Sequence, residues 1–396
     1  MSNHSCDVAQ RSLTLEQQPP RCSPGCVKVE VFFREWFVIA ASSRDELNSL
    51  HPQSLRRHDH VETSEEHSTL DNNTNMARAT FTKEQVHQIY DRINLPKTHR
   101  HDPGEESRTI ARGDDGLKFL SALQRHHLAN VPFENLELHY SPTKVINTDA
   151  NLLFDKIVTQ NTGRGGYCME NNLFFGTLLR SLGFSVMSTG GRVNMAVSPS
   201  GATGSEEKFT GFSHMVNIIT IQGKRYMVDV GFGTGQSTHP LELLDRSPSM
   251  NVKPSQQVRL RWDAIAEAEN KDAKMWIFER QDKADGPWIP TYCFPDNQEF
   301  LPQDYMVMSH FTSTHRISFF TYKIIVAKFL LDEAGEEVIG TLVMFGNSAH
   351  KRVAGVKEEL GTFEKEEERV DALERHFGIK LNEAQKGGIV GMVSAI

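Results

Sequence analysis

The spacing of apolar residues separates the chain into an N-terminal stretch with little pattern, a helical region and a region of strands. Residues 42–75 are crowded with Ser, His, Asn, Asp and Glu and show almost no apolar periodicity. Such a composition buries too little surface to offset the entropy that a chain loses on ordering. We therefore expect residues 1–75 to be a disordered extension, and Met76 to open the folded part.

Helical patterns fill residues 76–183. The first helix has a capping box at Thr82 and Gln85, after which apolar residues recur three or four positions apart. The fourth begins at Cys168 and carries an apolar face until Gly183 ends it. The expected helices span residues 82–93, 115–128, 148–158 and 168–182.

Strand patterns dominate after Gly183, as short runs rich in β-branched and aromatic residues between Gly, Ser and Pro. Residues 287–315 are rich in proline, which predicts an irregular segment. A charged amphipathic helix is expected over residues 365–377. The expected strands span residues 184–187, 192–197, 213–221, 224–230, 317–331 and 337–345.

Composition narrows the class of protein. The net charge of −8 argues against a general nucleic-acid binder, which needs a basic surface. Five cysteines are a sparse, odd set that forms no disulfide framework, which favours a reducing compartment. The N-terminus lacks a signal-peptide pattern, and the apolar run of residues 27–41 is too short and too charged to span a bilayer. We expect a cytoplasmic protein that binds neither nucleic acid nor membrane.

The first candidate for chemistry is Cys168, in the stretch RGGYCMENN of residues 164–172. Two glycines precede it and permit tight backbone conformations. A thiol at the start of a helix faces the positive end of the helix dipole, which is expected to lower its pKa. The alternative is a cysteine that packs as a small buried apolar side chain.

A histidine and an aspartate come together if residues 213–233 form a hairpin with Gln222 and Gly223 at its tip. In that register His214 and Asp229 are diagonal neighbours on one face of the hairpin. The carboxylate would then fix the tautomer of the imidazole and stabilise its charged form. A slip of one residue would place the two side chains on opposite faces.

Together these residues describe a cysteine nucleophile, a histidine base and an aspartate orienter, in the chain order Cys168, His214, Asp229. The same order suits papain-like proteases and transglutaminases. The residues therefore predict nucleophilic thiol chemistry and leave the acceptor open.

Two weaker signals are set aside. The spacing of Cys22 and Cys26 suits zinc, but no second pair of ligands follows, so no metal site is expected. Several histidines are adjacent or alternate in polar stretches and are expected to be solvated: His58, His60, His99, His101, His126 and His127.

Four stretches resemble the sequence motifs of the arylamine N-acetyltransferase family. RGGYCMENN resembles its cysteine motif, and DVGFG, residues 229–233, resembles its aspartate motif. VPFENLELH, residues 131–139, and TSTH, residues 312–315, resemble two further signatures. The stretches stand in the family's order and spacing between about residues 80 and 320. Phe311 replaces a tyrosine that many family members carry beside TSTH, so the hydrogen bond of that hydroxyl is lost.

The resemblance implies a role for each residue of the triad. Cys168 would take up an acyl group from a coenzyme A thioester, His214 would activate the thiol, and Asp229 would orient His214. Thr210 and Gly211, just before the histidine, would contact the coenzyme through a hydroxyl and a backbone N–H.

The resemblance also implies supporting residues. Glu134 would pair with Arg164 and brace the cysteine loop. Phe133, Val193 and Phe232 would line an apolar acceptor pocket, although each also suits a plain core position.

The implied fold is an α+β multidomain architecture with a Cys-His-Asp triad, as in cysteine-protease-like folds. An N-terminal helical bundle, residues 76–183, would carry the cysteine. A central β-barrel, residues 184–295, would carry the histidine and the aspartate. Residues 296–396 would form an interdomain segment and a C-terminal α/β lid.

The implied activity is that of an arylamine N-acetyltransferase, an enzyme of xenobiotic metabolism. It is a ping-pong transfer of an acyl group, expected to be acetyl, to an arylamine, hydrazine or hydroxylamine nitrogen. No tightly bound cofactor is expected, and acyl-coenzyme A serves as co-substrate. A cysteine hydrolase with the same triad and an N-acyltransferase that prefers malonyl or propionyl donors stay open. The intact triad disfavours an inactive binding protein, whereas the physiological amine and the oligomeric state stay open.

Overall fold

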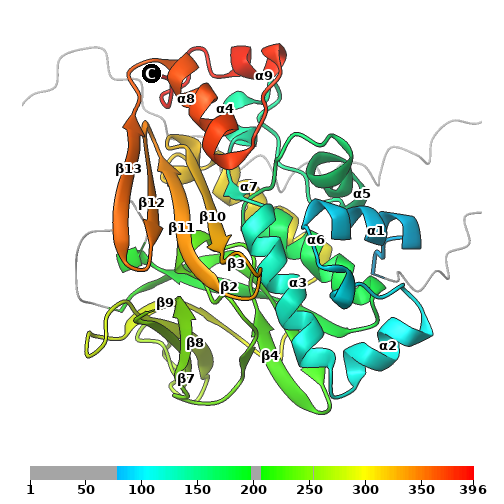
Figure 1. Ribbon diagram of the computed structural model, residues 1–396. Coiled ribbons are helices and arrows are strands. Elements are labelled where there is room, and N and C mark those ends of the chain that lie inside the picture. Colours follow the sequence, from blue (N-terminus) through cyan, green and yellow to red (C-terminus); the bar gives the residue numbers. More distant parts are fainter. Residues whose placement is uncertain (1–77, 198–206, 253) are drawn as a thin grey trace, which may run out of the picture. The chain divides into compact units, whose positions relative to one another are not determined.

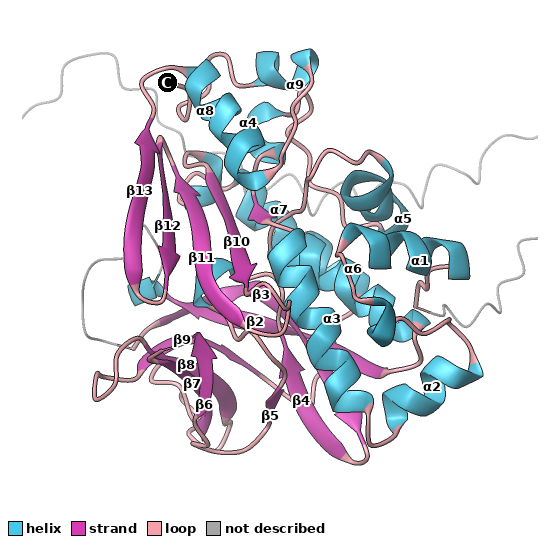
Figure 2. Ribbon diagram, in the orientation of Figure 1, coloured by secondary structure: helices cyan, strands magenta, loops and turns pink. Residues whose placement is uncertain are grey.

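The computed structural model describes residues 78–197, 207–252 and 254–396 (Figure 1). The extension expected over residues 1–75 lies outside these residues, as do Cys22 and Cys26. The described chain combines helices with two sheets, so the α+β class expected from the sequence is confirmed (Figure 2). Within the described residues, no helix is both long and apolar enough to cross a membrane.

Helices precede the large sheet. Thr82 caps the first of them as expected, because its hydroxyl accepts the N–H of Gln85 and the Gln85 side chain accepts the N–H of Thr82. The helix between residues 105 and 112 was not predicted, since Ile110 and Ala111 are its only apolar residues. These helices are α1 (Lys83–Arg92), α2 (Glu105–Arg112), α3 (Gly116–Asn130), α4 (Glu137–Tyr140), α5 (Ala150–Phe154), which a π-helical turn (Asp155–Thr159) extends, and α6 (Cys168–Ser181).

The larger sheet has eight strands in the order β5-β4-β3-β2-β9-β8-β7-β6, and each neighbouring pair is antiparallel. Its strands are β2 (Ser185–Asn194), β3 (Phe209–Ile221), β4 (Lys224–Val228), β5 (Leu241–Glu242), β6 (Ser249–Val252), β7 (Gln256–Asp263), β8 (Met275–Gln281) and β9 (Ile289–Phe294).

This sheet is only a half-barrel, so the β-barrel expected over residues 184–295 is found only in part. Closure requires the first and last strands to pair. The edges are β5 and β6, of 2 and 4 residues, and no ladder joins them within the described chain. β2 and β9 also meet over only two residue pairs, Arg192 with Cys293 and Val193 with Tyr292.

The smaller sheet has the order β1-β10-β11-β12-β13. The turn expected at residues 333–335 is confirmed between β10 and β11, but the first strand begins at Ile325 rather than at residue 317, because residues 319–321 form a 3₁₀ turn. The helix expected over residues 365–377 is confirmed as α8 with a π-helical turn (Leu373–Phe377). The bounds are β1 (Phe133–Glu134), β10 (Ile325–Leu331), β11 (Val338–Phe345), β12 (Ser348–Val353), β13 (Val356–Thr362), α8 (Glu366–Ala372) and α9 (Glu383–Gly388).

Residues 287–315 are regular rather than irregular, because they contain β9 and helix α7 (Pro302–Thr314). Pro302 stands in the first turn of α7, where the missing N–H removes no helical hydrogen bond. Met306 and Val307 are apolar yet exposed, so α7 has no apolar stripe for the sequence pattern to reveal.

Two adjacent histidines of α3 are buried rather than solvated. His126 and His127 are at most 4% exposed, and no ring nitrogen of either has a hydrogen-bond partner in the described part of the chain. The ring of His127 packs against the rings of Phe174 and Phe175, at centroid distances of 6.0 and 5.1 Å. Burial, together with a smaller effect of the charge of Arg92, lowers the pKa of His127 to about 3.

This buried ring makes stability depend on pH. Between about pH 3 and the usual histidine pKa near 6.5, the unfolded chain binds a proton that the folded chain does not, so acidification favours unfolding. We predict that His127→Leu reduces the loss of unfolding free energy between pH 7 and pH 4 by on the order of 3 kcal/mol. Urea unfolding of both proteins at several pH values measures this, and parallel stability curves would contradict it.

Candidate active site

Cys168 is the first residue of α6, at the end of a loop that two glycines allow to pack closely. A Cβ on Gly165 would lie 2.0 Å from the carbonyl oxygen of Pro132, and one on Gly166 would lie 2.6 Å from the Glu170 side chain. Glu170 in turn accepts the N–H of Tyr167 at 3.0 Å, which caps the helix. The glycines are therefore required by close approach rather than by an unusual backbone conformation.

The thiol is only 4% exposed, and its Sγ lies 3.6 Å from the carbonyl oxygen of Ser213. Burial raises the pKa of Cys168 well above its usual value, and the negative charge of Asp229 raises it further. The backbone N–H groups of Met169 and Cys168, at the positive end of α6, lower the pKa by less. The expectation of a lowered thiol pKa is therefore wrong, because desolvation outweighs the helix dipole.

His214 and Asp229 are brought together by the hairpin of β3 and β4. Its ladder runs from Asn217 opposite Val228 to Ile221 opposite Lys224, so the expected register is confirmed. The tip residues Gln222 and Gly223 have φ values of 48° and 77°, as in the hairpin turn whose twist matches paired strands.

The imidazole and the carboxylate form a buried hydrogen-bonded pair. Nε2 of His214 lies 2.8 Å from Oδ2 of Asp229, and the side chains are 2% and 0% exposed. Since Nε2 is engaged, Nδ1 is the nitrogen left to exchange a proton with another group.

Asp229 has further partners that the sequence did not reveal. Asn172 donates to its Oδ1 at 2.8 Å, and the N–H of Gly231 donates to the same oxygen at 2.8 Å. Burial acts to raise the pKa of Asp229, but His214 and these hydrogen bonds outweigh it and lower the pKa. Asn172 stands four residues after Cys168 on α6, and that i, i+4 spacing was the one available signal.

Backbone contacts bring the residue of the thiol, Cys168, close to the segments that carry His214 and Asp229. Cys168 contacts the carbonyl of Ser213, the residue before His214. A Cβ on Gly231 would lie 2.7 Å from Cα of Cys168, so the chain after Asp229 passes directly over the cysteine. Among the described residues no hydrogen bond joins Sγ of Cys168 to His214.

A buried charge cluster lies beneath the cysteine loop. Arg164 donates through Nε to Oε1 of Glu134 at 2.8 Å and through Nη2 to its Oε2 at 3.4 Å, and both side chains are at most 1% exposed. Lys156, which the sequence did not single out, donates to Glu170 at 2.8 Å. Burial acts to raise the pKa of Glu134, but Arg164 and Lys156 prevail and lower it to about 2.

The residues expected to line an acceptor pocket are half-buried but do not form one cluster. Phe232 packs its ring against His214 at a centroid distance of 5.0 Å. Phe133 packs among the apolar residues around Cys168. Val193 lies on β2, where its N–H donates to the hydroxyl of Thr210 at 3.1 Å.

The residues expected to contact the coenzyme lie on strand β3 rather than in a free turn. The hydroxyl of Thr210 also donates to the carbonyl of Gly211 at 2.9 Å, so it is already engaged within the protein. Gly211 is exposed. Phe311 of α7 is 48% exposed and stacks on His315, the residue that follows the helix.

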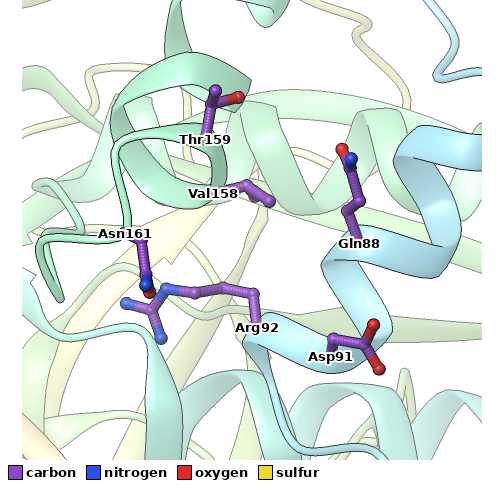
Figure 3. Close-up of a pocket in the computed structure, with 6 residues that line it drawn as sticks. All are labelled: Gln88, Asp91, Arg92, Val158, Thr159 and Asn161. Carbon is purple, nitrogen blue, oxygen red and sulfur yellow. The ribbon is translucent and has the colours of Figure 1, made fainter.

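A surface hollow of about 370 Å³ lies elsewhere, between α1 and the π-helical turn (Figure 3). None of the sequence-predicted site residues lines it. No group of three His, Cys, Asp or Glu side chains within the described residues is placed to hold a metal ion. The hollow is lined by Gln88, Asp91, Arg92, Val158, Thr159 and Asn161.

The charge cluster generates a prediction about stability. Glu134→Gln leaves the buried guanidinium of Arg164 without its main counter-ion, and we expect a loss of about 3–5 kcal/mol in unfolding free energy. The matched control is Glu137→Gln, because Glu137 also contacts Arg164, at 3.2 Å, but is 21% exposed. We expect this control to lose about 1 kcal/mol or less. Equal losses in denaturant unfolding of the two variants would refute the prediction.

Comparison with known proteins identifies the family to which the chain belongs. The profile of the N-acetyltransferase family matches residues 116–386. The N-malonyltransferase FDB2 of Fusarium pseudograminearum is 38% identical over 78% of this chain and 92% of its own length. Human arylamine N-acetyltransferase 1 is 34% identical over 32% of this chain and 41% of its own.

Solved structures are similar in fold. The arylamine N-acetyltransferase of Mycobacterium abscessus superposes with a TM-score of 0.62 at 22% identity, over 79% of this chain and 95% of that one. The enzyme of Mycobacterium marinum in complex with CoA superposes with a TM-score of 0.57 at 25% identity, over 77% of this chain and 98% of that one. With the family profile matched over most of its described length, the chain belongs to the arylamine N-acetyltransferase family.

Proposed function

We propose that the protein is an N-acyltransferase that carries an acyl group from a coenzyme A thioester, through Cys168, to the nitrogen of an arylamine or hydrazine. The observation that carries this proposal is the buried hydrogen bond of 2.8 Å between His214 and Asp229, next to a buried thiol at the start of a helix. Such a pair supplies a base for a thiol whose own pKa is too high for it to ionise alone.

The chemistry follows in two half-reactions. Nδ1 of His214 takes the thiol proton, and the sulfur of Cys168 attacks the thioester carbonyl. The C–S bond to coenzyme A breaks, and its sulfur leaves with the proton from the imidazolium. The amine then attacks the acyl-cysteine, His214 accepts a proton from nitrogen, and the proton returns to Sγ as the amide departs. Asp229 stabilises the imidazolium during both steps.

The coenzyme assignment is supported by the family and by the Mycobacterium marinum structure, which was solved with CoA. In this chain we assign the contact to Thr210 and Gly211, since the hydroxyls of Thr210 and Ser213 are 3.1 Å apart and the backbone carbonyl of Ser213 contacts the thiol. A coenzyme bound along this segment would present its thioester to Cys168.

We propose malonyl as the donor's acyl group, rather than the acetyl group expected from the sequence motifs. Curated N-malonyltransferases are 37–38% identical to the chain over 78–79% of its length. The human N-acetyltransferase matches only 32% of it. Phe133 and Phe232 would form an apolar surface for the aromatic ring of the acceptor.

The nucleophile is tested by intact-mass measurement after incubation with malonyl-, acetyl- and propionyl-CoA in the absence of amine. We expect the wild type to gain one malonyl group and Cys168→Ala to gain none. The control is Cys293→Ala, which removes the other buried cysteine of the described chain and should still be acylated. Acylation of Cys168→Ala would refute the assignment, and rapid loss of the group without amine would indicate a hydrolase instead.

The orienting role is tested by Asp229→Asn. An amide at this position no longer stabilises the imidazolium, so we expect single-turnover acylation to slow by about 100-fold or more. Thermal unfolding should show a modest change only, because the side chain keeps its shape. The exposed Asp245→Asn serves as control. Near-normal acylation of Asp229→Asn would mean that Asp229 does not act through His214.

A further inference from the structure

Arg192, on β2, is a half-buried cation whose partner on β3 is Phe212, two residues before His214. No carboxylate in the described part of the chain lies within ion-pair distance of it. Its guanidinium lies over the ring of Phe212, 4.1 Å from the centroid, and its Nη1 donates to the carbonyl of Thr210 at 3.1 Å. A guanidinium has five N–H groups, and this one bond engages only one of them. The others are available to an acceptor from outside the protein.

The segment of residues 210–213 connects Arg192 with the thiol. At one end Thr210 accepts from Arg192, and at the other the carbonyl of Ser213 contacts Sγ of Cys168 at 3.6 Å. Phe212, on which the guanidinium rests, packs in the same apolar cluster as Cys168. The pairing of β2 with β3 also places Arg192 near the histidine in register. Arg192 pairs with Phe212, and the preceding residue of β2 pairs with His214.

Acidic side chains in this region are occupied elsewhere. Glu207 and Glu267 both act electrostatically on Cys293, the strand partner of Arg192. Glu207, however, pairs with Arg261 at 2.8 Å, and Glu267 accepts the N–H of Phe209 at 2.5 Å. The positive charge of Arg192 is therefore not neutralised by either of them.

We propose that Arg192 binds the free carboxylate of the malonyl group while the thioester carbonyl lies at Cys168. This inference rests on the proposed function, and it names the residue that selects the donor. A malonyl group carries its carboxylate one methylene beyond the thioester carbonyl, and an arginine fork matches a carboxylate with two parallel hydrogen bonds. An acetyl group ends at a methyl and offers Arg192 no acceptor. The contact would thus favour malonyl over acetyl without touching the reacting bond.

The first test is donor selectivity. Steady-state rates of Arg192→Met and Arg192→Lys are measured with malonyl-CoA and acetyl-CoA and the same arylamine. We expect Arg192→Met to lower kcat/KM for malonyl-CoA by about 10- to 100-fold and for acetyl-CoA by about 3-fold or less. Arg192→Lys should retain part of the selectivity. The control is Arg259→Met, because Arg259 stacks on Trp288 at the same 4.1 Å but lies on β7 and, unlike Arg192, pairs with a carboxylate, Glu279, at 2.7 Å.

A second test needs no donor. Iodoacetate and iodoacetamide both alkylate Cys168 with loss of iodide, but only iodoacetate places a carboxylate beside the new C–S bond. We expect the ratio of the two rates at Cys168 to exceed that of a small thiol by about 10-fold in the wild type, and to lose this excess in Arg192→Met. The charges of Asp229 and Glu170 act on both variants alike, so the change in ratio isolates Arg192.

The outcomes separate the two proposals. Equal losses with both donors would mean that Arg192 supports the strand or contacts the coenzyme, and would overturn the inference, as would an unchanged alkylation ratio. If the wild type does not use malonyl-CoA while its alkylation ratio depends on Arg192, the proposed donor is wrong but carboxylate binding by Arg192 stands.

Discussion

The hydrogen bond between Nε2 of His214 and Oδ2 of Asp229 is the contact on which the arrangement of the described chain depends. A carboxylate with no exposure is tolerated only when its oxygens are paired. Oδ2 takes the imidazole from β3, and Oδ1 takes the Asn172 amide from α6. The backbone carbonyl of Asp229 takes the Gln124 amide from α3. Hydrogen bonds to the single buried residue Asp229 thus hold two helices and a hairpin together.

Charge also constrains the thiol. The negative charges of Asp229 and of Glu170, which is on the same helix turn, both act on Cys168. The thiol is therefore surrounded by negative charge as well as shielded from water. Under the proposed function this has a purpose. A thiol held neutral is protected from indiscriminate alkylation and oxidation, and it becomes nucleophilic only when His214 takes its proton. Selectivity for the thioester would then come from binding rather than from a permanently reactive sulfur.

A feature could be predicted from the sequence when the residues that cause it are close together along the chain. The register of β3 and β4 followed from a two-residue tip, and the cap of α1 from residues three apart. The sign of the Cys168 pKa shift was wrong because burial comes from segments far along the chain. Asn172 was missed because its partner stands 57 residues away. The β-barrel was inferred from resemblance alone, and no local pattern shows whether the edge strands of a sheet meet. The roles of the site residues remain proposals.

The two-residue strand β1 has neighbours on both sides. Towards β10, Phe133 and Glu134 pair with Ala327 and Val326. Towards the cysteine loop, Phe133 forms a parallel bridge with Gly166, and the N–H of Glu134 donates to the Gly166 carbonyl at 3.0 Å. A hinge motion of the C-terminal sheet would therefore break backbone hydrogen bonds that hold the cysteine loop. Side-chain rotations, which occur in nanoseconds, leave these hydrogen bonds intact, whereas a rigid-body opening would break them and is far slower.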